Sequence, residues 1–296
     1  MKIFTTVLFS IFYIFTTYGN INHNFDSIAD RDSNDNIKSI DVGVCTKFSN
    51  SSFLKDCGYS YIEENVGSLL IPNKDEEAFN NILNNLKDNP LPIYSCNGFI
   101  PAELRSVGPD AMHEEILKFA ETAFRRANIL GIKVIVFGSS GSRNIPEGFD
   151  SDVARKQFID LCKNMGPIAE KYGVTVAIEP LNKKESNFIN SVAEGGELLK
   201  EVNHPNIKLL VDIYHMLMED EKPESIIKYG KYISHVHIAE KQDRTVPGTH
   251  NENFSSYFNA LKEIGYEGKI SIEARWSSLE EQAKKAIETI LYQYKH

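Results

Sequence analysis

Short apolar runs alternate with longer segments of helical spacing from residue 40 to the end of the chain. Two of the longer segments, 109–130 and 151–172, repeat apolar residues at three- or four-residue steps and are predicted helices. Gly131 and Gly173 follow them directly and suit the left-handed position that ends a helix. The eight apolar runs are predicted strands: 40–45, 59–66, 91–96, 132–137, 174–179, 207–212, 232–239 and 269–273.

Eight strand–helix units in one domain predict a single α/β domain, a parallel (β/α)8 TIM barrel over residues 40–296. The alternative is an open, doubly wound sheet. The barrel is preferred because it explains why ligand-type residues occur at the ends of four successive late strands. The composition, 42% hydrophobic and 25% charged, allows a core of the size that such a barrel needs.

The N-terminal segment has a different character from the rest of the chain. Residues 1–19 combine Lys2 with a mostly apolar stretch and small or polar residues up to Gly19, the pattern of a secretory signal peptide. An uncleaved membrane anchor is the alternative, but interspersed Thr and Ser favour cleavage. Residues 20–39, rich in Asn, Asp and Ser, predict a flexible lead-in. We therefore expect a secreted or periplasmic protein with no stable membrane association after cleavage.

Charge and cysteine content narrow the classes of partner and fold. The formal net charge of −9 argues against a nucleic-acid partner, which needs cationic patches. Cys45, Cys57, Cys96 and Cys162 form no CxxC pair and are too scattered for a disulfide scaffold. In an oxidising compartment Cys45 and Cys57 could pair, or Cys45 could be a buried residue of its strand.

Four residues that can bind a metal stand at or near strand ends: Glu179, Asp212, His237 and Glu273. The carboxyl ends of all strands meet at one face of a barrel, so we expect these side chains to converge. Three carboxylates and one imidazole predict a site for one divalent metal, Mn²⁺ or Mg²⁺ before Co²⁺ or Zn²⁺. The four make a stronger signal together than any one of them alone.

Each residue also has a simpler explanation. The two glutamates could pair with nearby basic residues, and Asp212 could cap the next helix. His235 and His237 share one side of their strand, where they could be core histidines. Since His237 lies about 6.6 Å nearer the barrel mouth, we assign it as the ligand and His235 as its buried, hydrogen-bonded support. Asn97 and Phe99, just past a strand end, are expected to line the pocket.

From about residue 40 onward the chain resembles the xylose-isomerase-like TIM barrels, the sugar phosphate isomerase/epimerase group. The nearest motifs are those of ketose 3-epimerases of the D-tagatose 3-epimerase type: IEPLN, VDIYH, HVHIAE and SIEAR. The resemblance implies that the four strand-end residues hold the metal and that Glu179 and Glu273 exchange a proton on either face of a sugar. It also implies substrate contacts for Glu185, His215 and Arg244, although the loop before Arg244 is one residue longer than in those epimerases.

The resemblance implies a metal-dependent sugar isomerase or epimerase acting through an enediolate, with a small-molecule sugar as partner. The signal peptide and the lack of a basic cluster favour a non-phosphorylated substrate. A lyase or hydratase acting on a keto-glycoside is the alternative on the same metal site. A nuclease of the endonuclease IV type is disfavoured, because it would need histidines at earlier strand ends. A non-catalytic sugar-binding barrel is disfavoured as well, because a buried acidic cluster is costly and would have no role in it. Assembly into a homo-oligomer is left open.

Overall fold

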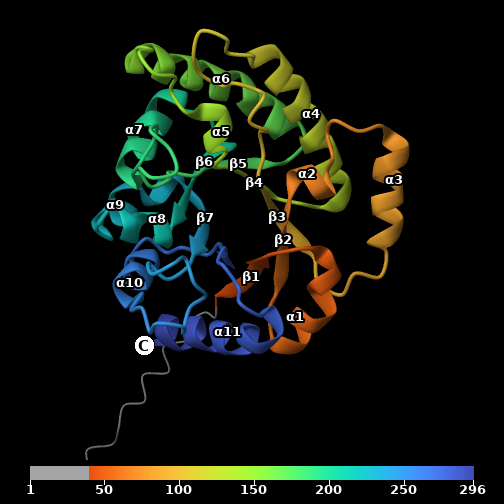
Figure 1. The fold of residues 1–296 in the computed structure, drawn as a ribbon, viewed down its shortest axis with the longest axis vertical. Helices are drawn as coiled ribbons and strands as arrows, with labels where there is room; N and C mark the ends of the chain where they lie inside the picture. The colour runs from red at the N-terminus through yellow and green to blue at the C-terminus, as the bar shows by residue number, and fades with distance from the viewer. Residues whose placement is uncertain (1–39) are drawn as a thin grey trace, which may run out of the picture. The chain divides into compact units, whose positions relative to one another are not determined.

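The computed structural model describes residues 40–296. The predicted signal peptide and lead-in, residues 1–39, lie outside the described residues. Eight strands pair in chain order, all parallel, and β1 (Asp41–Cys45) closes the ring against β8 (Lys269–Ile272) (Figure 1). The prediction of a single (β/α)8 TIM barrel is therefore confirmed.

Each predicted strand lies within a few residues of the observed one. The other strands are β2 (Tyr61–Asn65), β3 (Ile93–Asn97), β4 (Val134–Phe137), β5 (Thr175–Ile178), β6 (Ile207–Asp212) and β7 (Ile233–Ile238). The helices are α1 (Ser51–Cys57), α2 (Val66–Leu69), α3 (Glu76–Asn85), α4 (His113–Leu130), α5 (Ser140–Arg143), α6 (Ser151–Lys171), α7 (Val192–Val202), α8 (Ile213–Met218), α9 (Glu224–Tyr229), α10 (Ser255–Glu263) and α11 (Leu279–Lys295), with short 3-10 turns at Phe48–Asn50 and Gly230–Tyr232.

Local sequence signals set the ends of the two long helices. The carboxylate of Asp150 accepts hydrogen bonds from two backbone amides in the first turn of α6, at 2.8 and 3.0 Å. Gly131 and Gly173 take φ angles of 74° and 65°, the left-handed region that glycine enters without strain. The helix expected from residue 109 begins instead at His113, because Met112 has non-helical dihedral angles and serves as the N-cap residue.

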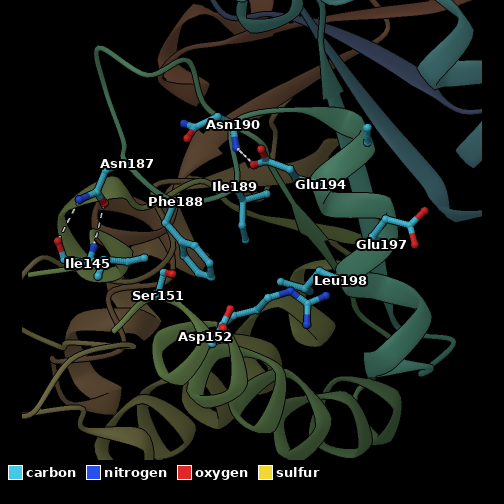
Figure 2. Close-up of a pocket in the computed structure, with 12 residues that line it drawn as sticks. Ile145, Ser151, Asp152, Asn187, Phe188, Ile189, Asn190, Glu194, Glu197 and Leu198 are labelled. Carbon is cyan, nitrogen blue, oxygen red and sulfur yellow. Dashed lines mark hydrogen bonds between the residues drawn. The ribbon is translucent and has the colours of Figure 1, made fainter. Parts of the chain in front are cut away.

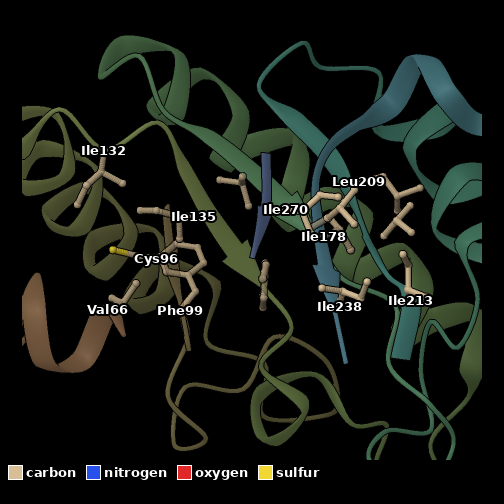
Figure 3. Close-up of a cluster of buried hydrophobic side chains, with 14 of the residues drawn as sticks. Val66, Cys96, Phe99, Ile132, Ile135, Ile178, Leu209, Ile213, Ile238 and Ile270 are labelled. Carbon is tan, nitrogen blue, oxygen red and sulfur yellow. The ribbon is translucent and has the colours of Figure 1, made fainter. Parts of the chain in front are cut away.

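The main hydrophobic core fills the layer between the strands and the surrounding helices (Figure 3). Outward-facing strand residues such as Ile135, Ile178, Leu209 and Ile270 are fully or almost fully buried there. Full burial of one such side chain stabilises the fold by about 1.5–3 kcal/mol before entropy is counted. This layer makes the barrel a rigid support for the residues at its mouth.

The inside of the barrel is divided between apolar and polar side chains. A small cluster of Val134, Val136, Ala177 and Leu210 fills one part. Tyr61 from β2 enters the barrel because position 43 on β1 is glycine. A Cβ there would lie 2.4 Å from the tyrosine ring. Beside it lie the buried polar residues Glu63, Ser95, His235 and Ser271, which form a polar floor beneath the barrel mouth.

The cysteines take no part in cross-links. All four lie within residues 40–296 and all are free thiols, so Cys45 and Cys57 are not paired. Between residues 40 and 296, none of the helices combines the length and apolar character needed to cross a membrane.

Candidate metal and substrate site

Four strand ends bring the predicted metal ligands together at the mouth of the barrel. Glu179 follows β5, Asp212 ends β6, His237 lies near the end of β7 and Glu273 follows β8. Strand register places Asp212 beside His237. One potential ligand atom from each of the four residues lies within 4.8 Å of those from the other three. The folded barrel therefore gathers the quartet into one cluster.

The hydrogen bonding of this cluster suits a cation. Glu179 Oε1 and His237 Nδ1 are buried and have no hydrogen-bond partner, although they lie 3.3 Å apart. His237 Nδ1 is also 3.2 Å from Glu273 Oε2. Buried polar atoms without partners are costly, and a divalent cation among these atoms would satisfy them. Three carboxylates and one imidazole fit such an ion.

Arg244 supplies positive charge to the same carboxylates. Its Nη2 atom lies 2.5 Å from Glu273 Oε2 and 3.3 Å from Asp212 Oδ2, while Nη1 lies 3.6 Å from Glu185 Oε2. The guanidinium also stacks over the Tyr214 ring at 4.7 Å from its centroid. Arg244 thus connects two members of the quartet to the predicted substrate residue Glu185.

The loop that carries Arg244 is anchored by a buried carboxylate. Glu240 is fully buried and accepts hydrogen bonds from the backbone amides of Gly248 and His250, at 2.8 and 2.6 Å. The Thr245 hydroxyl donates a third, at 3.1 Å. Arg244 itself has a φ of 55°, which is uncommon for a residue other than glycine. We infer that these bonds hold the loop in the conformation that points Arg244 at the cluster.

The acidic groups of the cluster have pKa values shifted in opposite directions. Burial raises the pKa of Glu179, and it raises that of Asp212 to about 6 although Arg244 opposes the change. Burial also acts on Glu273, but the charges of His237 and Arg244 outweigh it and lower the pKa to about 2. Opposite shifts on two carboxyl groups are typical of sites that carry out acid–base chemistry.

His215 presents a hydrogen-bond donor to the space above the cluster. Its Nδ1 atom accepts from the backbone amide of Asn182 at 3.1 Å and lies 2.8 Å from that residue's side-chain amide. The proton of a neutral ring is therefore on Nε2, which is buried, without a hydrogen-bond partner and 3.4 Å from Asp212 Oδ2. Asn182 also donates to Glu185 Oε1 at 2.9 Å, so it orients two predicted substrate residues.

A cavity of about 300 Å³ opens over the cluster. Besides Glu179, which lines it, seven residues predicted for the site lie on or beneath it. Asn97, Glu185, His215, Arg244 and Glu273 line it, while Asp212 and His237 lie beneath it. The remaining lining residues are Gly98, Ile100, Ala102, Gly138, Ser139, Ser140, Gly141 and Leu181. Small and polar side chains therefore form most of the wall.

Phe99 does not belong to this wall, which corrects the expectation that it lines the pocket. Its neighbour Gly98 has a φ of 61° and turns the chain. Phe99 is fully buried in the hydrophobic core, with ring centroids 5.5 Å from Phe124 and 5.6 Å from Phe137. Asn97, in contrast, donates a hydrogen bond to Glu273 Oε1 at 2.8 Å and so orients a quartet residue.

Sequence reasoning missed two residues that hold Glu179 in place. The side chain of Arg143 donates to the Glu179 carbonyl oxygen at 2.6 Å and fixes that stretch of backbone. Gly138 leaves the space that the Glu179 carboxylate occupies, since a Cβ there would lie 2.1 Å from Oε2. Both lie in the segment that follows β4.

His235 is buried below His237, in the supporting position expected for it. Its Nε2 atom lies 2.7 Å from Glu63 Oε2, and the opposite carboxylate oxygen of Glu63 lies 2.8 Å from His237 Nε2. Glu63 comes from β2 and was not predicted as part of the site. It connects the polar floor of the barrel to the quartet.

A larger cavity of about 470 Å³ lies outside the barrel, against α6 and α7 (Figure 2). The loop 187–190 forms one wall, where Asn187 is hydrogen-bonded to Ile145 and Glu194 accepts from the Asn190 amide. Its ionisable residues are Asp152, Arg155, Glu194 and Glu197, and no quartet residue reaches it. We therefore place the chemistry in the smaller cavity at the barrel mouth.

Two curated relatives match part of the sequence. L-ribulose 3-epimerase of Methylomonas sp. is 36% identical over 121 residues, 40% of this chain and 42% of that protein. The 3-dehydro-D-guloside 4-epimerase of Escherichia coli is 29% identical over 131 residues, 44% of this chain and 49% of that protein. The chain thus spans less than half the length of these curated relatives.

The fold is shared with a solved epimerase. The crystal structure of a D-psicose 3-epimerase in the presence of D-fructose superposes with a TM-score of 0.75, covering 87% of this chain and all of that one. The sequence identity is 19%, so this likeness shows the fold. The family model of the xylose isomerase-like TIM barrels matches residues 52–294, which is most of the sequence. The chain therefore belongs to the xylose isomerase-like TIM barrel family.

Proposed function

We propose that this protein is a divalent-metal-dependent isomerase or epimerase of a small, non-phosphorylated sugar. One observation carries the proposal. Glu179 and Glu273 reach the same cavity from β5 and β8, and both belong to the carboxylate–histidine quartet beneath it. Two carboxylates that face one cavity can remove and return a proton on different sides of a bound molecule.

The quartet would hold the metal through the three carboxylates and His237 Nδ1. Once bound, a divalent cation supplies the positive charge that stabilises the negative charge of a developing enediolate. The expected ions remain Mn²⁺ or Mg²⁺, with Co²⁺ or Zn²⁺ as alternatives.

The protein's own side chains divide the remaining work. One of Glu179 and Glu273 takes the proton from the carbon beside the sugar carbonyl, and the other, in its protonated form, donates a proton to the opposite face, which inverts that carbon. His215 Nε2–H, which has no hydrogen-bond partner, would donate to a substrate oxygen. Arg244 and Glu185 would fix further hydroxyl groups, since both line the cavity.

The cavity wall supports a substrate without phosphate. Arg244 is the single arginine or lysine among its lining residues, and its guanidinium already contacts Asp212, Glu185 and Glu273. A phosphate group would be repelled by several carboxylates, and the one cationic side chain, Arg244, is already paired with them. A free sugar also agrees with the proposed secreted or periplasmic location, which rests on the pattern of residues 1–19.

A keto-glycoside lyase is the second candidate. The Escherichia coli relative, a 3-dehydro-D-guloside 4-epimerase by name, supports the substrate class of this candidate and not its lyase activity. Such a substrate would lose the same kind of proton and then expel a substituent one carbon further away. The quartet and both glutamates would serve that reaction equally well. The two activities differ in their products.

Proton NMR in D2O separates the candidates. The purified chain would be loaded with Mn²⁺ and incubated with L-ribulose, D-psicose, D-fructose or a 3-keto-glycoside, and each reaction would be quenched with chelator before the spectrum is recorded. We expect deuterium to enter one carbon of a ketose and a new epimer to form. The Glu179→Gln and Glu273→Gln variants should each lower that rate by about 10²–10⁴-fold. Release of an aglycone would identify the lyase instead, and a metal-loaded protein that exchanges no carbon-bound hydrogen in any of these sugars would contradict the proposal.

A further inference from the structure

We infer that Glu63 is a positioning residue that fixes His237 with its Nδ1 atom toward the metal, a role that rests on the proposed metal site. Glu63 lies on β2 and contacts Nε2 of the His237 ring, whereas Glu179 and Glu273 lie beside Nδ1 on the other side of that ring. Its Oε1 atom is 2.8 Å from His237 Nε2, whereas His237 Nδ1 is 3.3 Å from Glu179 Oε1. The two nitrogens of one ring therefore face two different carboxylate groups.

The Glu63 carboxylate is held from three other strands. Its Oε2 atom accepts from the hydroxyls of Ser95 on β3 and Ser271 on β8, both at 2.6 Å, and lies 2.7 Å from His235 Nε2 on β7. The side chain is fully buried. A buried carboxylate with partners on both oxygens has a single position available to it. Glu63 is thus a fixed acceptor against which the His237 ring is set.

A different role for Glu63 is also open on distance alone. Ligand atoms of Cys45, Glu63 and His237 lie within 4.8 Å of one another, which would allow a second metal group. The hydrogen bonds decide between the two groups. Both Glu63 oxygens already have donors, whereas Glu179 Oε1 and His237 Nδ1 have none. Glu179 Oε1 belongs to the quartet alone and lacks a partner, whereas both Glu63 oxygens are occupied, so Glu63 supports a ligand and is not one.

This arrangement has a defined effect on His237. With Nε2–H donated to Glu63, the lone pair of a neutral ring lies on Nδ1, which is beside the carboxylates of Glu179 and Glu273. A carboxylate behind a metal-binding histidine fixes the ring orientation and makes the ligand nitrogen more basic. Loss of such a partner costs about 10–100-fold in metal affinity.

The test combines Glu63→Gln with a matched control on the same strand. Glu64→Gln also neutralises a buried glutamate, but Glu64 faces away from the site and accepts from the Phe48 amide and the Ser68 hydroxyl. We expect calorimetric titration to give a 10–100-fold weaker Mn²⁺ affinity for Glu63→Gln and an unchanged affinity for Glu64→Gln. Equal affinities for Glu63→Gln and the wild type would overturn the inference.

An NMR measurement on the wild type keeps the test independent of the variant's folding. With ¹⁵N-labelled histidine, the proton on His237 Nε2 should give a slowly exchanging, downfield cross-peak in both the metal-free and the Zn²⁺-loaded protein. Glu63→Gln should shift that peak or lose it. A wild-type His237 without a proton on Nε2 would refute the role of Glu63. If the wild type binds no Mn²⁺ but shows the peak, the proposed metal site fails while the Glu63 contact stands.

Discussion

A methyl group at position 138 tests how tightly the site is built. Gly138 comes directly after β4 and lines the cavity beside Glu179. A Cβ at this position would lie 2.1 Å from Glu179 Oε2 and 3.3 Å from its Cδ. Ordinary contact begins at 3.4 Å, so Gly138→Ala forces the carboxylate oxygen to move by about 1.3 Å. The backbone of Glu179 cannot follow freely, because Arg143 holds its carbonyl oxygen.

The size of that displacement sets the expected loss. Metal–ligand distances tolerate about 0.2 Å, and a 1 Å misplacement of a catalytic group costs about 100-fold. We therefore expect Gly138→Ala to weaken both Mn²⁺ binding and sugar turnover by about 100-fold, equivalent to about 2.7 kcal/mol. The new methyl group borders a cavity, so the free energy of unfolding should change far less than metal binding does.

Calorimetric titration with Mn²⁺ measures the effect, and Gly141→Ala is the matched control. Gly141 lines the same cavity, and its Cβ would meet the Ala102 side chain at 2.7 Å without approaching the quartet. The control should bind Mn²⁺ as the wild type does. Binding of Mn²⁺ by Gly138→Ala within twofold of the wild type, or an equal loss of affinity in both variants, would contradict this prediction.

Two further predictions concern pH and the Arg244 loop. Metal binding requires ionised carboxyls, and the pKa values of Glu179 and Asp212 are raised, the latter to about 6. Mn²⁺ affinity should therefore fall as the pH drops through about 6, with proton uptake on metal release; a titration series that is flat from pH 7.5 to 5 would contradict this. Glu240→Gln should raise KM more than it lowers kcat and should cost about 1–3 kcal/mol of stability in urea unfolding, because backbone amides of the loop lose a charged acceptor; an unchanged KM would argue against the anchoring role.

The sequence predicted those parts of the site that follow from the geometry of strands. Parallel strands in a closed ring bring their carboxyl ends to one face, so residues at four strand ends had to meet. The positions of the four residues in the apolar runs were enough to predict that their side chains converge: Glu179, Asp212, His237 and Glu273. Asp212 has both of the roles that its sequence position allowed. It belongs to the quartet, and its carboxylate caps α8 by accepting a hydrogen bond from the Tyr214 amide at 2.8 Å.

Other parts of the site depend on the direction in which a side chain points, and the pattern of apolar residues does not give that direction. Glu63 and Glu64 are adjacent on β2, between apolar or ambiguous neighbours, so period two says that one faces inward but not which one. Phe99 follows a turn at Gly98, and a positive φ at that glycine sends the ring into the core. Gly138 matters because it has no side chain. The sequence pattern does not show that the Glu179 carboxylate occupies the space beside it.

The free cysteines bear on how the chain can be produced and handled. No disulfide joins any part of residues 40–296, so the barrel stays closed through its own strand pairing. Burial raises the pKa of all four thiols, which keeps them protonated at neutral pH and slow to react. Residues 40–296 contain no disulfide that an oxidising compartment would have to form. We therefore expect residues 40–296 to fold under reducing conditions as well as under oxidising ones.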